Sequence, residues 1–123
     1  MKEQRKEIRY NSQAEVKFPE IDGGESFLKD LSITGCRIEC PNSGTIELKT
    51  QYRLEIIPEK AANIGFFDLL VESKWVRPGD YSQEVGFAIV ESPKGKQFQH
   101  YVDYLSWRYS QGDSMTGNGP EKD

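Results

Sequence analysis

The sequence predicts a mainly β fold, a small antiparallel barrel with one C-terminal α-helix. Several short segments alternate apolar and polar residues with a period of two, which is typical of strands with one buried face. Clusters of proline, glycine and asparagine separate these segments. After residue 93 the apolar residues change to helical spacing, so the strands come first and a single helix follows.

The alternating segments define the expected strands. They are residues 13–18, 36–40, 45–49, 52–57, 66–77 and 84–90. A turn at residues 78–80 joins the last two segments as a hairpin. In the longest segment Trp75 shares a face with Leu69 and Val71, so we expect it to pack in the core. The alternative is an exposed ring that stacks on a nucleic-acid base.

The helix is predicted from Pro93 onward. Ser92 is a typical N-cap residue, and Pro93 suits the first helical position because its missing N–H needs no partner there. The apolar residues of one helix face follow at i, i+3, i+4, i+7 and i+11: Phe98, Tyr101, Val102, Leu105 and Tyr109. Trp107 lies off this stripe and is expected to face a protein partner.

The chain has 123 residues and is expected to form one domain with a hydrophobic core that needs no disulfide or metal ion. Residues 1–12 are highly charged and aperiodic, which predicts a flexible arm before the domain of residues 13–110. Residues 111–123 are rich in Gly, Ser and acidic residues and are predicted to be disordered. No apolar run approaches the roughly 18 residues that cross a membrane, and no signal peptide is recognisable. We therefore expect a cytoplasmic protein that does not insert into a membrane.

The cysteine and histidine content argues against a disulfide, a metal site and catalysis. Cys36 and Cys40 lie on one face of strand 36–40, roughly 13 Å apart by strand rise, which is too far for a disulfide. His100 is the single histidine, so a zinc site has too few ligands. Because no nucleophile and base pair can be proposed around it, we expect neither an enzyme nor a cofactor.

Two motifs predict a ligand site. Arg5 and Arg9 stand four positions apart in the arm, just before the first expected strand. About twenty residues later, Asp30, Ser32 and Gly35 form the pattern Asp-x-Ser-x-x-Gly. Asp and Ser readily hydrogen-bond backbone or ligand, and Gly permits a positive φ or a close backbone approach. Alone, this pattern is more often an ordinary structural turn, and the arginine pair favours a site.

Together the two motifs resemble the signature of the PilZ domain, a bacterial receptor for the second messenger cyclic di-GMP. The resemblance covers about residues 5 to 108. It implies a six-stranded antiparallel β-barrel of the split-barrel type with an appended helix. It also implies that the arm wraps over a ligand seated on the barrel.

The resemblance implies a role for each motif residue, and the chemistry of the ligand suits these residue types. Arg5 and Arg9 would clamp phosphate or guanine, because a guanidinium pairs with phosphate oxygens and with the O6 and N7 edge of guanine. Asp30 would accept hydrogen bonds from guanine N1 and N2. Ser32 would offer its hydroxyl to the base or a phosphate, and Gly35 would admit the ligand close to the backbone.

Gln4 and Arg37 are additional candidates for the site. In many relatives an extra arginine just before the pair accompanies two stacked ligand molecules. Gln4 stands at that position here, which favours one ligand per site. Arg37 is predicted on the outward face of its strand, near the turn, where it is either a further ligand contact or an ordinary surface charge.

The charge distribution favours a small anionic ligand over a nucleic acid. The net charge is −4, whereas general nucleic-acid binding requires a basic face. In residues 1–10 four basic and two acidic side chains leave a local charge of +2. We expect a cyclic di-GMP receptor and adaptor whose arm becomes ordered on binding and signals to an unidentified protein partner. The alternative is a PilZ-like protein–protein interaction module that does not bind nucleotide.

Overall fold

The computed structural model describes residues 8–19, 21, 25–42, 45–91 and 96–112. It contains seven strands, one short 3₁₀ helix and one α-helix in these ranges. Their bounds are β1 Tyr10–Asn11, β2 Glu15–Lys17, β3 Ser26–Leu31, β4 Gly35–Pro41, β5 Gln51–Ile57, η1 Lys60–Ala62, β6 Phe67–Pro78, β7 Ser82–Glu91 and α1 Gln97–Ser110. The predicted helix start is wrong, because α1 begins at Gln97 and its N-cap residue is Lys96 rather than Ser92. Ser92 and Pro93 themselves, and residues 113–123 of the predicted tail, lie outside the described residues.

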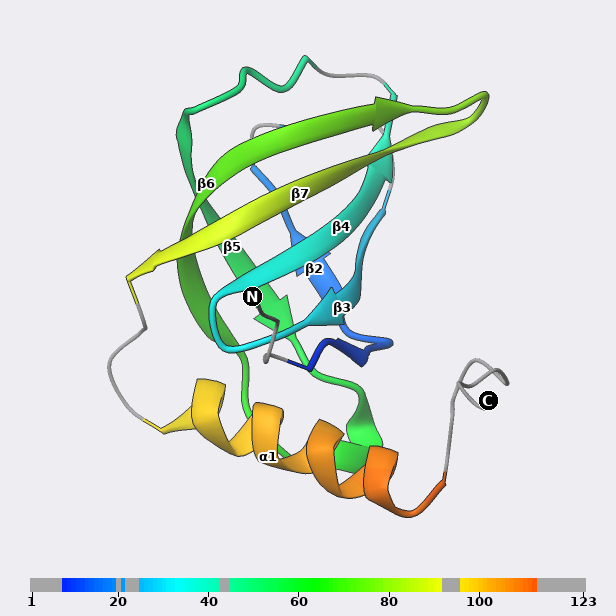
Figure 1. Cartoon of the computed structure of the whole chain (residues 1–123), viewed down its shortest axis with the longest axis vertical. Coiled ribbons are helices and arrows are strands. Elements are labelled where there is room, and N and C mark those ends of the chain that lie inside the picture. The colour runs from blue at the N-terminus through cyan, green and yellow to red at the C-terminus, as the bar shows by residue number, and fades with distance from the viewer. Residues whose placement is uncertain (1–7, 20, 22–24, 43–44, 92–95, 113–123) are drawn as a thin grey trace, which may run out of the picture.

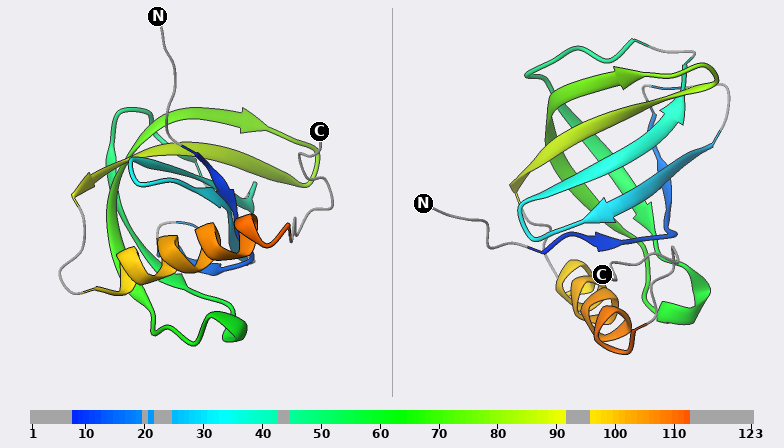
Figure 2. Two further views of the ribbon diagram at one scale, coloured as in Figure 1. Left: turned by 60° about the horizontal axis from the view of Figure 1, so that its bottom comes forward. Right: turned by 45° about the vertical axis from the view of Figure 1, so that its right-hand side comes forward.

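Six strands form an antiparallel barrel in the order β2, β5, β6, β7, β4 and β3. The pairing of β3 with β2 closes the barrel. The two-residue strand β1 lies outside this closed sheet and pairs with the end of β3. Figure 1 shows α1 crossing one end of the barrel, and Figure 2 shows β1 between that end and the helix. The predicted fold class, a six-stranded antiparallel barrel with a C-terminal helix, is confirmed.

The core follows the alternation of the sequence. Cys36, Ile38 and Cys40 are buried on the inner face of β4, and both thiols are free. On α1 four of the five residues of the predicted stripe are buried: Phe98, Tyr101, Val102 and Leu105. The fifth, Tyr109, is half exposed and packs edge-on against Tyr10 of β1, with the ring centroids 5.6 Å apart.

The strand predicted at residues 45–49 is wrong. The described residues 45–50 form a turn that is held by Ser73 of β6. Lys49 has a φ of 56°, which an extended strand does not allow, and its N–H donates to the Ser73 carbonyl at 2.9 Å. The Ser73 hydroxyl donates in turn to the carbonyl of Glu47. The loop therefore satisfies its backbone through a side chain, which alternation cannot reveal.

The prediction that Trp75 packs in the core is also wrong. Ser73 pairs with Phe87 of β7 but Trp75 pairs with Gly86, so Lys74 is an extra residue in β6. This β-bulge turns the side chains that follow it to the opposite face. Trp75 consequently lies on the outer face of the barrel with 37% of its surface exposed.

Burial of the thiols predicts a loss of stability in alkaline solution. Burial raises the pKa of Cys36 from 9.0 to about 12 and that of Cys40 to about 11. Above pH 9 the unfolded chain therefore releases protons that the folded chain keeps. The free energy of unfolding should fall between pH 9 and 11 by up to about 1.4 kcal/mol per pH unit for each thiol.

Urea unfolding at a series of pH values measures this slope. In Cys36→Ala one of the two thiols is gone, so its slope above pH 9 should be shallower than that of the wild type, whatever its absolute stability. Parallel curves for the two proteins would contradict the assignment.

Candidate functional site

The turn between β3 and β4 is built by Ser32. Its hydroxyl accepts hydrogen bonds from the N–H of Gly35 at 3.1 Å and of Thr34 at 3.3 Å, and its own N–H donates to the Gly35 carbonyl at 2.9 Å. The residue is buried, with 1% of its surface exposed. In this structure the serine of the motif therefore shapes the turn from inside, and its proposed contact with a ligand stays a prediction.

Gly35 stands where three parts of the chain meet. A Cβ atom at this position would lie 2.9 Å from the carbonyl oxygen of Phe87 in β7 and 3.2 Å from Nη2 of Arg9. Any side chain would push against the backbone of β7 and against the arginine of the arm. The glycine is thus required for close approach rather than for a positive φ.

Asp30 is the centre of the site. Its Oδ1 accepts a hydrogen bond from Nη1 of Arg9 at 2.8 Å, and its Oδ2 accepts one from Nε of Arg37 at 2.9 Å. A β-bulge explains its direction, because Leu28 pairs with Ile38 while Asp30 pairs with Arg37, the next residue of β4. Without this irregularity Asp30 would share the inner face of Leu28.

Asp30 begins a row of residues that lie opposite one another across four neighbouring strands. It pairs with Arg37 of β4, Arg37 pairs with Gly86 of β7, and Gly86 pairs with Trp75 of β6. The indole of Trp75 lies directly over Gly86, because a Cβ atom there would fall 2.2 Å from its Cε2 and Nε1 atoms. We call Asp30, Arg37, Gly86 and Trp75 the outer row.

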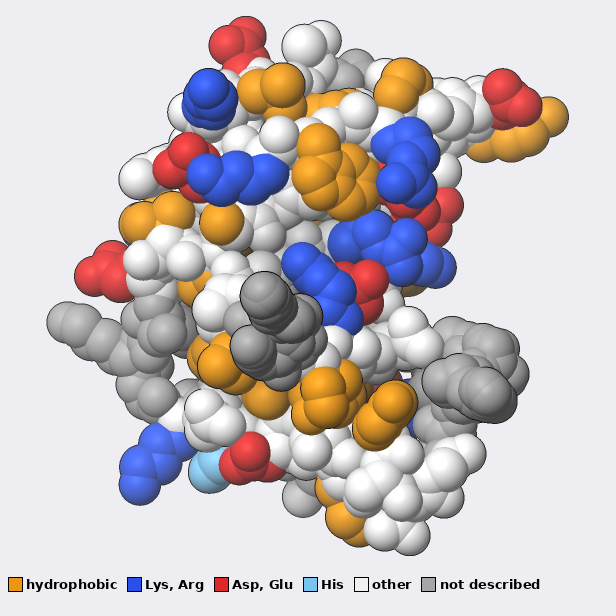
Figure 3. Space-filling model, viewed as in Figure 1, with side chains coloured by type: hydrophobic (Ala, Val, Ile, Leu, Met, Phe, Trp, Pro, Cys, Tyr) orange, Lys and Arg blue, Asp and Glu red, His pale blue; other side chains and the backbone are white. Residues whose placement is uncertain are grey.

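A second carboxylate stands beside the outer row. Glu84 of β7 accepts from Nη1 of Arg37 at 3.3 Å and from Nη1 of Arg77 at 3.0 Å. The Arg77 guanidinium in turn lies 5.1 Å from the centre of the Trp75 ring. Figure 3 shows this face, where basic side chains gather over β4, β6 and β7 around an exposed hydrophobic group.

This face still has hydrogen-bonding groups available for an anionic ligand that itself carries hydrogen-bond donors. Three arginines, Arg9, Arg37 and Arg77, stand against Asp30 and Glu84, so three positive less two negative charges leave +1. Among the residues that the structure describes, Arg9 uses one nitrogen and Arg37 two in these bonds. Each oxygen of Asp30 has a second lone pair for another donor.

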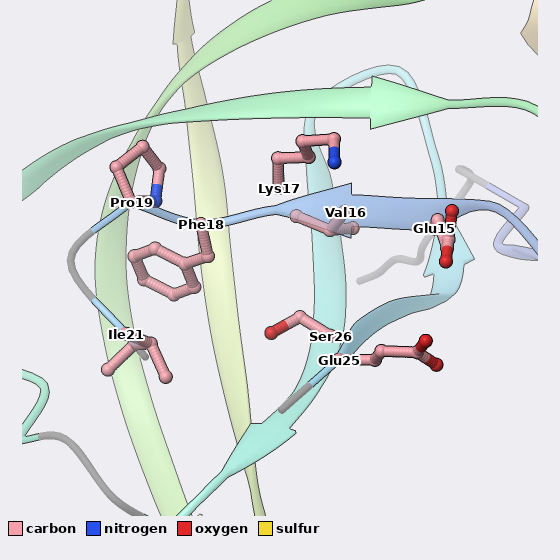
Figure 4. A pocket seen from close by; sticks show the side chains of 8 residues that line it. All are labelled: Glu15, Val16, Lys17, Phe18, Pro19, Ile21, Glu25 and Ser26. Atoms are coloured by element: carbon pink, nitrogen blue, oxygen red, sulfur yellow. The ribbon is translucent and has the colours of Figure 1, made fainter. Parts of the chain in front are cut away.

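A separate cavity opens between β2 and β3 and does not include the outer row (Figure 4). It has a volume of about 400 Å³ and is lined by Glu15, Val16, Lys17, Phe18, Pro19, Ile21, Glu25 and Ser26. Its charged residues are two glutamates and one lysine, a balance of −1, so it does not suit a dianion.

The structure also bears on metal binding and membrane spans. Within the described ranges, no group of three or more His, Cys, Asp or Glu side chains is placed to hold a metal ion. None of the helices in these ranges is long and apolar enough to span a bilayer.

The closed barrel, the appended helix and the arginines gathered at the β3–β4 turn define a class of small β-barrel domains, and comparison with known proteins identifies the family. The sequence pattern of the PilZ domain matches residues 3–107, so the chain belongs to the PilZ domain family. A search of the curated proteins found no match.

A solved structure with a similar fold is the Bacillus subtilis inhibitor of motility, MotI/DgrA. It has a TM-score of 0.69 and 16% sequence identity, and the match covers 89% of this chain. The match covers 52% of the MotI/DgrA chain, so this chain spans about half the length of that protein.

The structure brings together four of the residues predicted for the site: Arg9, Asp30, Gly35 and Arg37. Ser32 lies in the same turn with its hydroxyl directed inward, and Gln4 and Arg5 lie outside the described residues.

Sequence reasoning left the far half of the face out of the predicted site: Arg77, Glu84 and Gly86 were not singled out, and an exposed Trp75 was only the alternative to core packing. The short turn after β6 could have revealed two of these residues, because a hairpin with its turn at that point pairs Arg77 with Glu84. The bulge at Lys74, which exposes Trp75, left no such mark in the alternation.

The contact between Trp75 and Gly86 predicts an effect of a single methyl group. Gly86→Ala should lift the indole away from β7 and into water, because the new Cβ atom overlaps the present ring position. In a Trp107→Phe background, which leaves one tryptophan, the emission of Trp75 should shift to longer wavelength and acrylamide should quench it more strongly.

Gly65→Ala is the matched control, since a Cβ atom there has no neighbour within 4 Å. Its spectrum should equal that of the Trp107→Phe parent. An unchanged spectrum in the Gly86 variant would show that the indole does not rest on this glycine.

Proposed function

We propose that this PilZ domain is a receptor for cyclic di-GMP that passes the binding event to a protein partner. The observation that carries the proposal is the pairing of Arg9 and Arg37 with one carboxylate, that of Asp30, beside Gly35. This arrangement places guanidinium donors and a carboxylate acceptor together on the outer side of the barrel, where the side chain of Arg9 is 48% exposed and that of Asp30 13%. A guanine nucleotide has acceptors on its O6 and N7 edge and donors at N1 and N2, so it complements both.

Asp30 serves two purposes in this proposal. It holds both arginines by charge-assisted hydrogen bonds, and its remaining lone pairs accept the N1 and N2 donors of guanine. The free nitrogens of Arg9 and Arg37 then bind a phosphate oxygen or the O6 and N7 edge. Arg5, which lies outside the described residues, would add a second clamp from the arm, as the family motif implies.

The outer row suits a second part of the same ligand. Trp75 offers a flat apolar surface at the other end of the row from Asp30, and base stacking on an aromatic ring contributes about 1 to 3 kcal/mol. Arg37 lies between Asp30 and the indole, within reach of a phosphate. We therefore propose Trp75 as a ligand contact in addition to the motif residues.

The role of adaptor rests on the arm. Arg9 joins β1 to the site, and β1 lies beside α1, so a ligand that binds Arg9 affects the surface formed by the arm and the helix. That surface exposes Trp107, with 56% of its area accessible. A receptor that works in the cytoplasm through a protein partner is consistent with this arrangement, and the partner would meet the arm and α1.

Calorimetric titration with cyclic di-GMP tests the proposal. The wild type should show saturable binding at micromolar concentration or below, worth about 8 kcal/mol or more. Arg9→Ala and Asp30→Ala should weaken binding by at least about tenfold, since each removes a charge-assisted hydrogen bond to the ligand. GTP and cyclic di-AMP serve as ligand controls and should not compete at equal concentration.

Arg53→Ala is the matched control variant. Arg53 is an exposed arginine of β5, a strand outside the outer row, so its loss should leave the affinity unchanged. If the wild type releases no heat of binding, and cyclic di-GMP does not compete for the site even at high concentration, the proposal is contradicted. The interaction module without nucleotide would then be the better description of this chain.

A further inference from the structure

One short segment of the arm holds both the proposed nucleotide site and the C-terminal helix. Arg9 bonds to Asp30, and three residues later the hydroxyl of Ser12 lies 2.7 Å from the hydroxyl of Tyr101 in α1. The residues between them form β1, in which Tyr10 pairs with Leu31 and Asn11 with Asp30. The Ser12 N–H also donates to the Lys29 carbonyl at 3.1 Å. The site and the helix are therefore attached to opposite ends of one hydrogen-bonded strand.

The direction of the hydrogen bonds at Tyr101 follows from its single proton. Its hydroxyl donates to Oε1 of Glu59 at 2.6 Å, so it must accept the proton of Ser12. The Ser12 oxygen accepts in turn from the N–H of Ala14 at 3.0 Å. The other oxygen of Glu59 accepts from Arg108 of α1, so the bonds run from the arm to Tyr101 of the helix, on to Glu59 in the β5–β6 connection, and back to the helix at Arg108.

This network lies inside the protein. Ser12, Tyr101 and Arg108 are all buried, and the side chain of Glu59 is 14% exposed. Burial makes each bond stronger and makes a lost partner costly, so the bond between Ser12 and Tyr101 is a firm link between the arm and the helix. A second contact, the edge-on packing of Tyr10 against Tyr109, joins β1 to the last turn of the same helix.

We propose that Tyr101 is a positioning residue for the nucleotide site. It fixes the Ser12 end of β1 and, through this short strand, holds Arg9 beside Asp30. Binding free energies are reciprocal, so a ligand that binds Arg9 and Asp30 stabilises the docked state of α1 to the same extent. The inference rests on the proposed function and adds the path by which the ligand acts on the helix.

Tyr101→Phe tests the path, because it removes the hydroxyl and keeps the ring that packs on Phe67. Two quantities are measured: the affinity for cyclic di-GMP by calorimetry and the amide hydrogen exchange of residues 97–110 with and without ligand. In the wild type the ligand should slow exchange in α1. In Tyr101→Phe the affinity should fall by about fivefold or more, and α1 should no longer respond while the turn at residues 30–35 still does.

Tyr104→Phe is the matched control on the same helix. Its hydroxyl accepts from Arg108 and makes no hydrogen bond to residues 8–12, the described part of the arm, so affinity and exchange should follow the wild type. Ser12→Ala removes the same hydrogen bond from the arm's side, by deleting the hydroxyl of Ser12. It should reproduce the effect of Tyr101→Phe, and the double variant should add nothing further to the loss.

The outcomes separate the two proposals. A wild type that does not bind cyclic di-GMP removes the proposed function and the inference with it. A wild type that binds with unchanged exchange in α1 overturns the path alone. An equal loss in Tyr104→Phe, or unchanged affinity and helix response in Tyr101→Phe and Ser12→Ala, overturns it as well.

Discussion

The face that carries the proposed site depends on one carboxylate, that of Asp30. Two arginines from different segments, Arg9 of the arm and Arg37 of β4, converge on its two oxygens. Like charges repel each other, and the carboxylate that both arginines contact offsets this repulsion. A β-bulge in β3 turns Asp30 outward, and the tight turn ending at Gly35 leaves room for the arm. The bulge and the charge arrangement are therefore linked, because the bulge places Asp30 where both arginines can contact it.

The same arm serves the helix. Without residues 10–12 of the arm, α1 would lose both the Ser12 hydrogen bond and the Tyr10 ring contact. The buried pair of Glu59 and Arg108 holds the helix to the β5–β6 connection from the other side. A ligand bound on the barrel face would thus have a short physical route to α1, through packed and hydrogen-bonded groups.

The sequence predicted those parts of the structure that follow regular periods or a fixed motif spacing. Alternation placed Ile38 in the core, and helical spacing placed Leu105 there, because each element keeps its period over that stretch. Asp30 and Trp75 each follow a bulge, where one extra residue exchanges the two faces of the strand. The motif identified Asp30 through its spacing, whereas the alternation favoured a core position for Trp75 over the alternative of an exposed, base-stacking ring. The inward hydroxyl of Ser32 could not be predicted either, since it accepts hydrogen bonds from the backbone N–H groups of Thr34 and Gly35 in its own turn.

The most direct test of the central claim is an NMR titration of the ¹⁵N-labelled protein with cyclic di-GMP. We expect four signals to shift together and to saturate at one ligand concentration: the Nε–H signals of Arg9 and Arg37, the Gly35 amide and the indole N–H of Trp75. Signals of residues that line the cavity between β2 and β3, such as Val16, should stay in place. Shifts confined to that cavity, or none at saturating ligand, would contradict the assignment of the site to the outer row.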